Sequence, residues 1–236
     1  MSTAPRLSNR VALITGASRG IGAAVAERFA AEGAHVILAA RTVGGLEEVD
    51  DRVKAKGGTA TLVPVDLTDF DKIDQLGQSI FERFGRLDIV VGNAATLGDL
   101  SPVSHYNPKI WDRVFALNVT TNYRLIRSLD RLLRGSDAGR AIFVTSGVGH
   151  SPVAYFGAYA ASKAALEMMV KMYALEVTKS PLKVNLLDPG VVRTKLRAQG
   201  FPGEDPLTHP APEEITERFV ELAEPACRYH GEIVPV

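Results

Sequence analysis

Apolar runs of strand length alternate along the chain with amphipathic segments of helical length. The clearest runs fall at residues 11–15, 35–39, 60–65, 88–91, 141–145 and 183–187, with a weaker one at 232–236. They are continuously apolar rather than alternating, which is typical of strands that are buried on both faces of a parallel sheet. We therefore expect an α/β fold: a Rossmann-like, doubly wound parallel sheet of about seven strands with helices on both faces.

The pattern indicates a single domain over residues 1–236, with one irregular segment. That segment, RAQGFPGEDPLTHPAPE at 197–213, holds four prolines and two glycines and reads as a loop before a last helix. Doubly wound sheets bind ligands beyond the carboxyl ends of their strands. We therefore expect the chain around 191–213 to form a lid over a substrate site there.

Charge and composition exclude several classes of protein. The 236 residues include 27 Lys and Arg and 27 Asp and Glu, so the net charge is near zero. The protein therefore has no overall positive charge to attract nucleic acid or an anionic membrane. A single cysteine, Cys227, excludes an internal disulfide, and histidines without ligand spacing predict no metal site. No apolar run reaches the ~18 residues of a membrane span, and the N-terminus lacks an apolar signal region. We expect a cytoplasmic protein without nucleic-acid or membrane partners.

A glycine-rich loop joins the first strand to the first helix. The sequence TGASRGIG at 15–22 puts Gly16, Gly20 and Gly22 where the backbone must turn tightly, approach a pyrophosphate and pack helix against strand. The free N–H groups of a helix N-terminus also favour anionic oxygens. A strand before the loop and a helix after it therefore predict a dinucleotide-binding site rather than an ordinary turn.

The end of the second strand predicts which dinucleotide binds. An acidic residue there commonly holds both ribose hydroxyls of NAD, whereas a 2′-phosphate needs cationic donors. This chain has Ala40 followed by Arg41, and Arg19 of the glycine loop can approach the same phosphate from the other side. The pattern favours NADP(H) over NAD(H). The alternative is that both arginines are ordinary solvated surface residues.

A phenol and an ammonium share one helical face in YAASK at 159–163. Tyr159 and Lys163 are four positions apart, so they should project together. Because a neighbouring ammonium favours the phenolate, we expect the pKa of Tyr159 to fall from ~10 toward the range useful for acid–base catalysis. The pair alone is weak evidence for catalysis, since a surface tyrosine beside a solvated lysine is common.

Taken together, these motifs resemble the short-chain dehydrogenase/reductase family, in its compact single-domain branch. The resemblance covers nearly the whole chain, in order: TGASRGIG at 15–22, Asp66, GNAA at 92–95, Asn118, Ser146, YAASK at 159–163 and DPGVVRT at 188–194. The family places a serine thirteen residues before its catalytic tyrosine, and Ser146 stands thirteen residues before Tyr159. The resemblance implies one NAD(P)-binding Rossmann domain.

The resemblance also implies roles for a catalytic tetrad of Asn118, Ser146, Tyr159 and Lys163. Tyr159 would exchange a proton with the substrate oxygen, and Ser146 would donate a hydrogen bond to it. Lys163 would hold the nicotinamide ribose and lower the pKa of the tyrosine, and Asn118 would help hold a water in a proton relay. Taken singly, Ser146 could instead be a turn residue and Asn118 a helix-bending residue.

The cofactor contacts implied by the resemblance extend along the chain. Asp66 would bond the adenine amino group, unless it is an N-cap, and Asn93 would support the adenosine ribose and strand packing. The full set is Gly16, Ser18, Arg19, Gly20, Ile21, Gly22, Arg41, Asp66, Leu67, Asn93, Ala94, Tyr159, Lys163, Pro189, Gly190, Val192 and Thr194.

We therefore expect an NADP(H)-dependent oxidoreductase that interconverts a small-molecule carbonyl and an alcohol. A non-catalytic NAD(P)-binding regulatory protein and an isomerase or lyase of the same family are the alternatives. The resemblance implies a homodimer or homotetramer. Two departures from the family bear on the details: Ala95 stands where a glycine is common, and the chain ends at GEIVPV without a glycine-rich tail, which leaves the assembly open.

Overall fold

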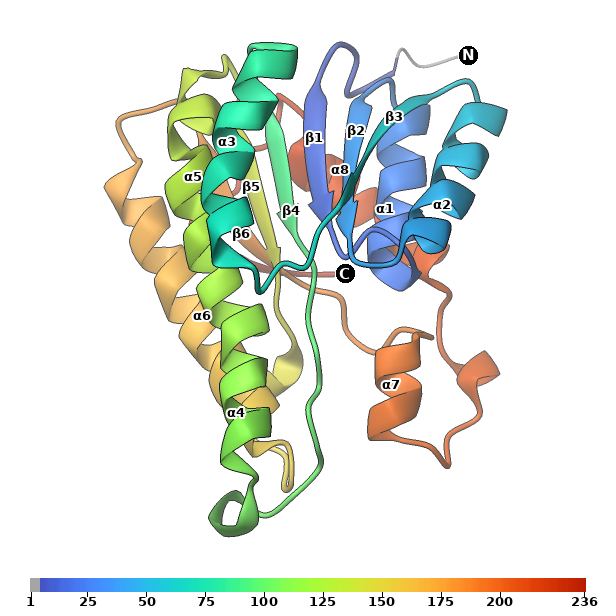
Figure 1. Ribbon diagram of the computed structural model, residues 1–236, viewed down its shortest axis with the longest axis vertical. Coiled ribbons are helices and arrows are strands. Elements are labelled where there is room, and N and C mark those ends of the chain that lie inside the picture. The colour runs from blue at the N-terminus through green and yellow to red at the C-terminus, as the bar shows by residue number, and fades with distance from the viewer. Residues whose placement is uncertain (1–4) are drawn as a thin grey trace.

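A computed structural model describes residues 5–236, which form one seven-stranded sheet in the order β3-β2-β1-β4-β5-β6-β7 (Figure 1). All neighbouring strands are parallel. The strands are β1 Val11–Thr15, β2 His35–Ala40, β3 Thr59–Pro64, β4 Ile89–Gly92, β5 Arg140–Val144, β6 Lys183–Asp188 and β7 Ile233–Pro235. Each lies within one residue of its predicted bounds, so the predicted fold class is confirmed.

Helices cover both faces of the sheet. They are α1 Gly20–Ala31, α2 Val43–Ala55, α3 Phe70–Phe84, α4 Pro108–Phe115, α5 Thr121–Gly135, α6 Gly157–Glu176, α7 Lys195–Gly200 and α8 Thr216–Ala223. Helices α1, α2 and α8 share one hydrophobic core with the sheet, and α3, α5 and α6 share a second core on the opposite face (Figure 1). Strands enclosed in this way explain the continuously apolar runs of the sequence.

The strand order reverses between β1 and β4, because the chain first builds outward through β2 and β3 and then returns to the other side of β1. The carboxyl ends of the strands meet at the lower edge of the sheet in Figure 1, and the segments that carry α4 and α7 extend beyond that edge. Such a switch point is where open parallel sheets bind ligands.

Two local features lie at this edge. Helices α4 and α5 are joined by a π-helical turn at Ala116–Thr120, which contains Asn118. The segment predicted to be irregular from residue 197 is partly helical, because α7 begins at Lys195; the Thr194 hydroxyl caps it by accepting a hydrogen bond from the Arg197 N–H at 3.2 Å. Among the helices of residues 5–236, none combines the length and apolar character needed to cross a bilayer.

Candidate active site

The glycine loop after β1 needs its glycines for two different reasons. Gly16 and Gly20 have φ of 67° and 56°, in the left-handed region where side chains are strained. Gly22 has ordinary backbone angles, but a Cβ there would collide with the Gly16 carbonyl oxygen and with the Asn93 amide. The loop is therefore packed against the residues that follow β4.

The N-terminus of α1 is suited to an anion. Arg19 is its N-cap, and within residues 5–236 no side chain caps the helix and no acidic residue lies in its first turn. Its first N–H groups therefore lack a side-chain acceptor, which fits the phosphates of a dinucleotide. Ser18 and Ile21 belong to the same loop, and Ser18 lies against Gly45 at the start of α2.

Thr15 joins the ends of β1 and β4. Its buried hydroxyl accepts hydrogen bonds from the Asn93 N–H at 3.0 Å and the Ala94 N–H at 3.1 Å, and donates to the Val91 carbonyl at 3.2 Å. The Asn93 side-chain amide donates to the Thr15 carbonyl at 2.9 Å. The expected packing role of Asn93 is therefore observed, whereas its contact with a ribose stays a prediction.

The predicted 2′-phosphate site lies at the end of β2. Ala40 is buried, whereas Arg41 and Arg19 are exposed. The Asp66 carboxylate accepts hydrogen bonds from the Thr68 N–H at 2.9 Å and from its hydroxyl at 2.8 Å. These bonds, with a smaller contribution from the positive charge of Arg41, lower the pKa of Asp66. Asp66 therefore forms a local turn rather than the N-cap of α3, which is Asp69.

Tyr159 and Lys163 lie on one face of α6, as predicted. Both are buried, and the Lys163 Nζ lies 5.6 Å from the centroid of the Tyr159 ring. Lys163 also donates a hydrogen bond of 2.8 Å to the carbonyl of Val144, the last residue of β5. The pair is therefore held against the carboxyl end of the sheet, next to the switch point.

The expected direction of the pKa shift of Tyr159 is wrong for this structure. Burial raises the pKa of Tyr159 to about 12, and a hydrogen bond with Ser146 lowers it only in part. Burial also lowers the pKa of Lys163 to about 8, opposed by the negative charges of Glu167 and Asp188. Desolvation of the phenolate, together with the negative charge of Asp188, outweighs the effect of Ser146, and the hydrogen bond of the Lys163 ammonium goes to a backbone carbonyl.

Ser146 and Asn118 complete the predicted tetrad at the same edge. Ser146 follows β5 and Thr145, and it begins the short turn Gly147–Gly149. Asn118 is fully buried; its side-chain oxygen accepts from the Thr96 N–H at 2.9 Å, and its amide donates to the Ser162 hydroxyl at 3.0 Å. Asn118 thus links the chain after β4 to α6, beside Lys163. The water-holding role implied by the resemblance stays a prediction.

The segment after β6 closes over this edge. Gly190 has φ of 63°, and its N–H donates to the Asp188 carboxylate at 3.0 Å. Val192 is buried, and a Cβ on Gly20 would lie 3.7 Å from the Thr194 methyl group. This segment and the glycine loop are therefore neighbours.

Helix α7 and the residues after it pack on the loops beside Tyr159. The Gln199 side chain donates to the Gly98 carbonyl at 3.1 Å. The rings of Phe156 and Phe201 stack with centroids 5.4 Å apart, in a cluster that contains Leu97 and Tyr159. Apolar side chains therefore surround the phenol on the side of α7.

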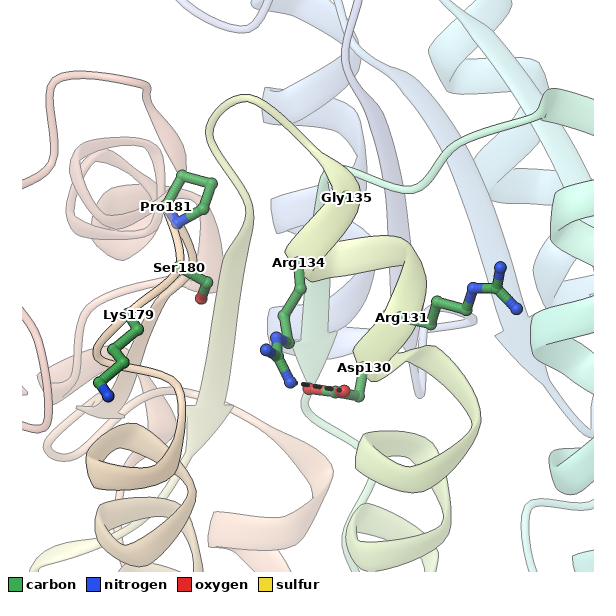
Figure 2. A pocket seen from close by; sticks show the side chains of 7 residues that line it. All are labelled: Asp130, Arg131, Arg134, Gly135, Lys179, Ser180 and Pro181. Carbon is green, nitrogen blue, oxygen red and sulfur yellow. Dashed lines mark ion pairs between the residues drawn. The ribbon is translucent and has the colours of Figure 1, made fainter.

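A separate pocket lies at the opposite end of the sheet (Figure 2). It is lined by Asp130, Arg131, Arg134, Gly135, Lys179, Ser180 and Pro181. These residues precede the first residues of β5 and β6, so the pocket is remote from the carboxyl ends of the strands. Arg134 forms an ion pair of 3.6 Å with Asp130 there.

Within residues 5–236, no group of three or more His, Cys, Asp and Glu side chains could hold a metal ion.

Comparisons with known proteins agree with this geometry. A family model described as short chain dehydrogenase matches residues 10–205. The oxidoreductase YciK of Escherichia coli K12 is 38% identical over 219 residues, which are 92% of this chain and 86% of that protein. The chain therefore belongs to the short-chain dehydrogenase family and is an oxidoreductase.

Two solved structures of the family are close to the whole molecule. A short chain dehydrogenase from Shigella flexneri 2a, complexed with NADP, is 37% identical with a TM-score of 0.95, covering 99% of each chain. One from Escherichia coli CFT073, complexed with NADPH, is 36% identical with a TM-score of 0.93, covering 99% of this chain and 98% of that chain.

Sequence reasoning missed two residues at the site. Thr15 is the first residue of the glycine motif and had no predicted role of its own, yet its hydroxyl accepts the hydrogen bonds that fix the turn after β4. Glu167, one helical turn after Lys163, has a carboxylate 2.6 Å from the Thr145 hydroxyl. The spacing of four from Lys163 was the signal available for Glu167.

Proposed function

We propose that this protein is an NADP(H)-dependent oxidoreductase that interconverts a carbonyl and an alcohol by hydride transfer, with Tyr159 as the acid and base. The observation that carries the proposal is the buried Tyr159, with Ser146 close enough to lower its pKa and Lys163 beside it, at the sheet edge that also carries the glycine loop. These residues provide a proton, a hydrogen-bond donor and a positive charge at one place.

The residues at this edge fit a dinucleotide. Within residues 5–236, no side chain caps the first N–H groups of α1, so these groups can donate to a pyrophosphate, and the close packing of Gly22 against Gly16 and Asn93 holds the loop beside them. Exposed Arg19 and Arg41, with no acid at Ala40, support a 2′-phosphate, as do the NADP and NADPH complexes of the two structural relatives. When bound, the nicotinamide supplies or accepts the hydride. The remaining cofactor residues are those named from the family resemblance.

The protein's own side chains then donate the proton and stabilise the charge on the substrate oxygen. A pKa of about 12 keeps the Tyr159 phenol protonated at neutral pH, so it can donate to a carbonyl oxygen as negative charge develops there. Ser146 donates a second hydrogen bond to that oxygen. Lys163 holds the ribose hydroxyls, and Asn118 keeps α6 and the chain after β4 in register.

The substrate is a small-molecule carbonyl or alcohol that enters beneath the lid at 191–213. Phe156, Phe201 and Leu97 beside Tyr159 support an apolar group next to the reacting carbon. The chain acts as a homodimer or homotetramer. Met168, Met172 and Leu175 support this assembly, because they expose 62%, 50% and 69% of their surface along α6.

A panel of ketones, aldehydes and quinones, assayed for NADPH oxidation, tests the proposal. We expect at least one carbonyl to be reduced, and Tyr159→Phe to lose that activity while still binding NADPH. A parent protein that binds NADPH but reduces no carbonyl would favour the regulatory alternative. A parent that converts a substrate without net NADPH consumption would favour the isomerase or lyase.

A further inference from the structure

Glu167 is a buried carboxylate in the same helix as the proposed acid and its lysine. It follows Lys163 by one turn of α6 and Tyr159 by two turns, and only 7% of its side chain is exposed. A buried charge at this position costs desolvation energy unless it makes specific hydrogen bonds. Its partners therefore indicate what it does.

Both partners of Glu167 flank the turn that begins with Ser146. The Thr145 hydroxyl, directly before Ser146, donates to the Glu167 Oε1 at 2.6 Å. The His150 Nδ1, directly after Gly147–Gly149, lies 3.1 Å from the same oxygen. One carboxylate oxygen thus fastens the turn at both ends.

Gly149 allows this close approach. A Cβ at Gly149 would lie 2.7 Å from the Glu167 Oε1 and 3.1 Å from the Lys163 Cβ, so a larger residue would push the turn away from α6. Lys163 makes a parallel link one turn earlier, through its 2.8 Å hydrogen bond to the Val144 carbonyl. Helix α6 is therefore tied to the end of β5 by two successive turns.

The same carboxylate acts on the charge of Lys163. The titratable groups that face Lys163 are Tyr159 and Glu167 from its own helix, Asp188 from the end of β6, and His150 from the turn, whose Nε2 lies 3.9 Å from Asp188. Burial lowers the pKa of Lys163 to about 8, while Glu167 and Asp188 raise it. Removing the charge of Glu167 therefore lowers this pKa further.

We propose that Glu167 is a positioning residue of the reaction, which holds the turn carrying Ser146 at a fixed distance from Tyr159 and Lys163. The inference rests on the proposed function, because Glu167 acts only through these three residues. It needs no contact between Glu167 and the substrate.

Three variants test it: Glu167→Ala, Glu167→Gln and the control Glu176→Gln, which makes the same charge change on an exposed side chain nine residues further along α6. With a ketone that the parent reduces, Glu167→Ala should lose at least about tenfold in kcat, because misplaced donors raise the barrier, while the NADPH Kd stays within about threefold. Glutamine keeps an acceptor oxygen, so kcat at pH 6.5 should recover to within about threefold of the parent.

The pH profile separates positioning from a purely structural role. Carbonyl reduction should decline as the pH rises through the pKa of Lys163, and in Glu167→Gln this decline should begin at a lower pH than in the parent. If Glu167→Ala does not fold, Thr145→Val replaces it, since it removes one hydrogen bond to the same oxygen and should lower kcat at least about threefold.

Several results would overturn the inference. The inference would be refuted if Glu167→Ala kept kcat within twofold of the parent, or if Glu167→Gln left the pH profile unchanged. It would also be refuted if Glu176→Gln changed kcat and the pH profile as much as the Glu167 variants do. Each of these results would leave the proposed function intact. A parent that reduces no carbonyl in the panel would overturn the proposed function, and the positioning role with it.

Discussion

Thr15→Val should destabilise the protein through the hydrogen bonds it removes. The variant keeps the size and branching of the side chain, but the Ala94 N–H loses its acceptor at 3.1 Å, and the Asn93 N–H keeps only the Val91 carbonyl, also at 3.1 Å. An N–H group left without a partner costs about 1–3 kcal/mol when buried. Ala94 is half-buried, and the Val91 carbonyl also loses the Thr15 hydroxyl as a donor, so we expect a loss of about 2 kcal/mol in the free energy of unfolding.

Thr15→Ser is the matched control, because it keeps the hydroxyl and loses only a buried methyl group, at about 1 kcal/mol. Urea unfolding at equilibrium, followed by circular dichroism and by the fluorescence of Trp111, the one tryptophan in the chain, measures both variants against the parent. We expect the valine variant to be less stable than the serine variant and to bind NADPH more weakly. Equal stability of the two would refute this reading of Thr15.

Three further predictions concern the cofactor, the proton and acid stability. Tyr159→Phe should lower turnover by ~10²-fold or more and leave NADPH affinity within a few-fold, as measured by kinetics and fluorescence titration. The parent should bind NADPH at least about tenfold more tightly than NADH, and Ala40→Asp with Arg41→Ile should reverse that preference at matched salt; equal affinities in the parent would mark the arginines as surface residues. Burial would raise the pKa of Asp88, but hydrogen bonds from Arg86 and its neighbours outweigh it and hold the pKa below 3.8. The stability from Asp88 is therefore complete above about pH 4 and lost as the pH falls further, and Asp88→Asn should flatten that loss in acid unfolding curves.

The inner strands could be predicted closely because burial on both faces leaves a direct mark on the sequence, whereas β3 at the sheet edge is only half-buried and still carries an apolar run. Each apolar run corresponds to one strand, from Val11–Thr15 to Ile233–Pro235. Helix α7 left no such mark. Its six residues depend on the Thr194 cap and on Gly200, which packs against Leu97 and Phe156 from distant parts of the chain.

In the candidate site, too, some features could be predicted from local sequence and others depend on contacts between distant parts of the chain. The glycines and the Tyr159–Lys163 pair follow from local rules of turn and helix geometry, and the structure places them at one edge of the sheet. The pKa of Tyr159 does not follow from those rules. Spacing suggested a lower value, but Leu97 and Phe156 enclose the ring, and this packing exists only in the folded chain. Thr15 and Glu167 were missed for the same reason, since their partners come from other elements.

Burial shifts the pKa of Tyr159 up and that of Lys163 down, which sets the protonation state of each side chain near neutral pH. With a pKa of about 12, the phenol holds its proton throughout the neutral range, whereas an alcohol can be deprotonated only by the phenolate that burial disfavours. Lys163, with a pKa of about 8, is mostly charged at pH 7 and loses that charge as the pH rises. Alkaline conditions would therefore have to supply the phenolate while removing the ammonium beside it. On the proposed function, Tyr159 of the free protein is therefore ready near neutral pH to act as the acid in carbonyl reduction, whereas acting as the base requires that it first lose its proton.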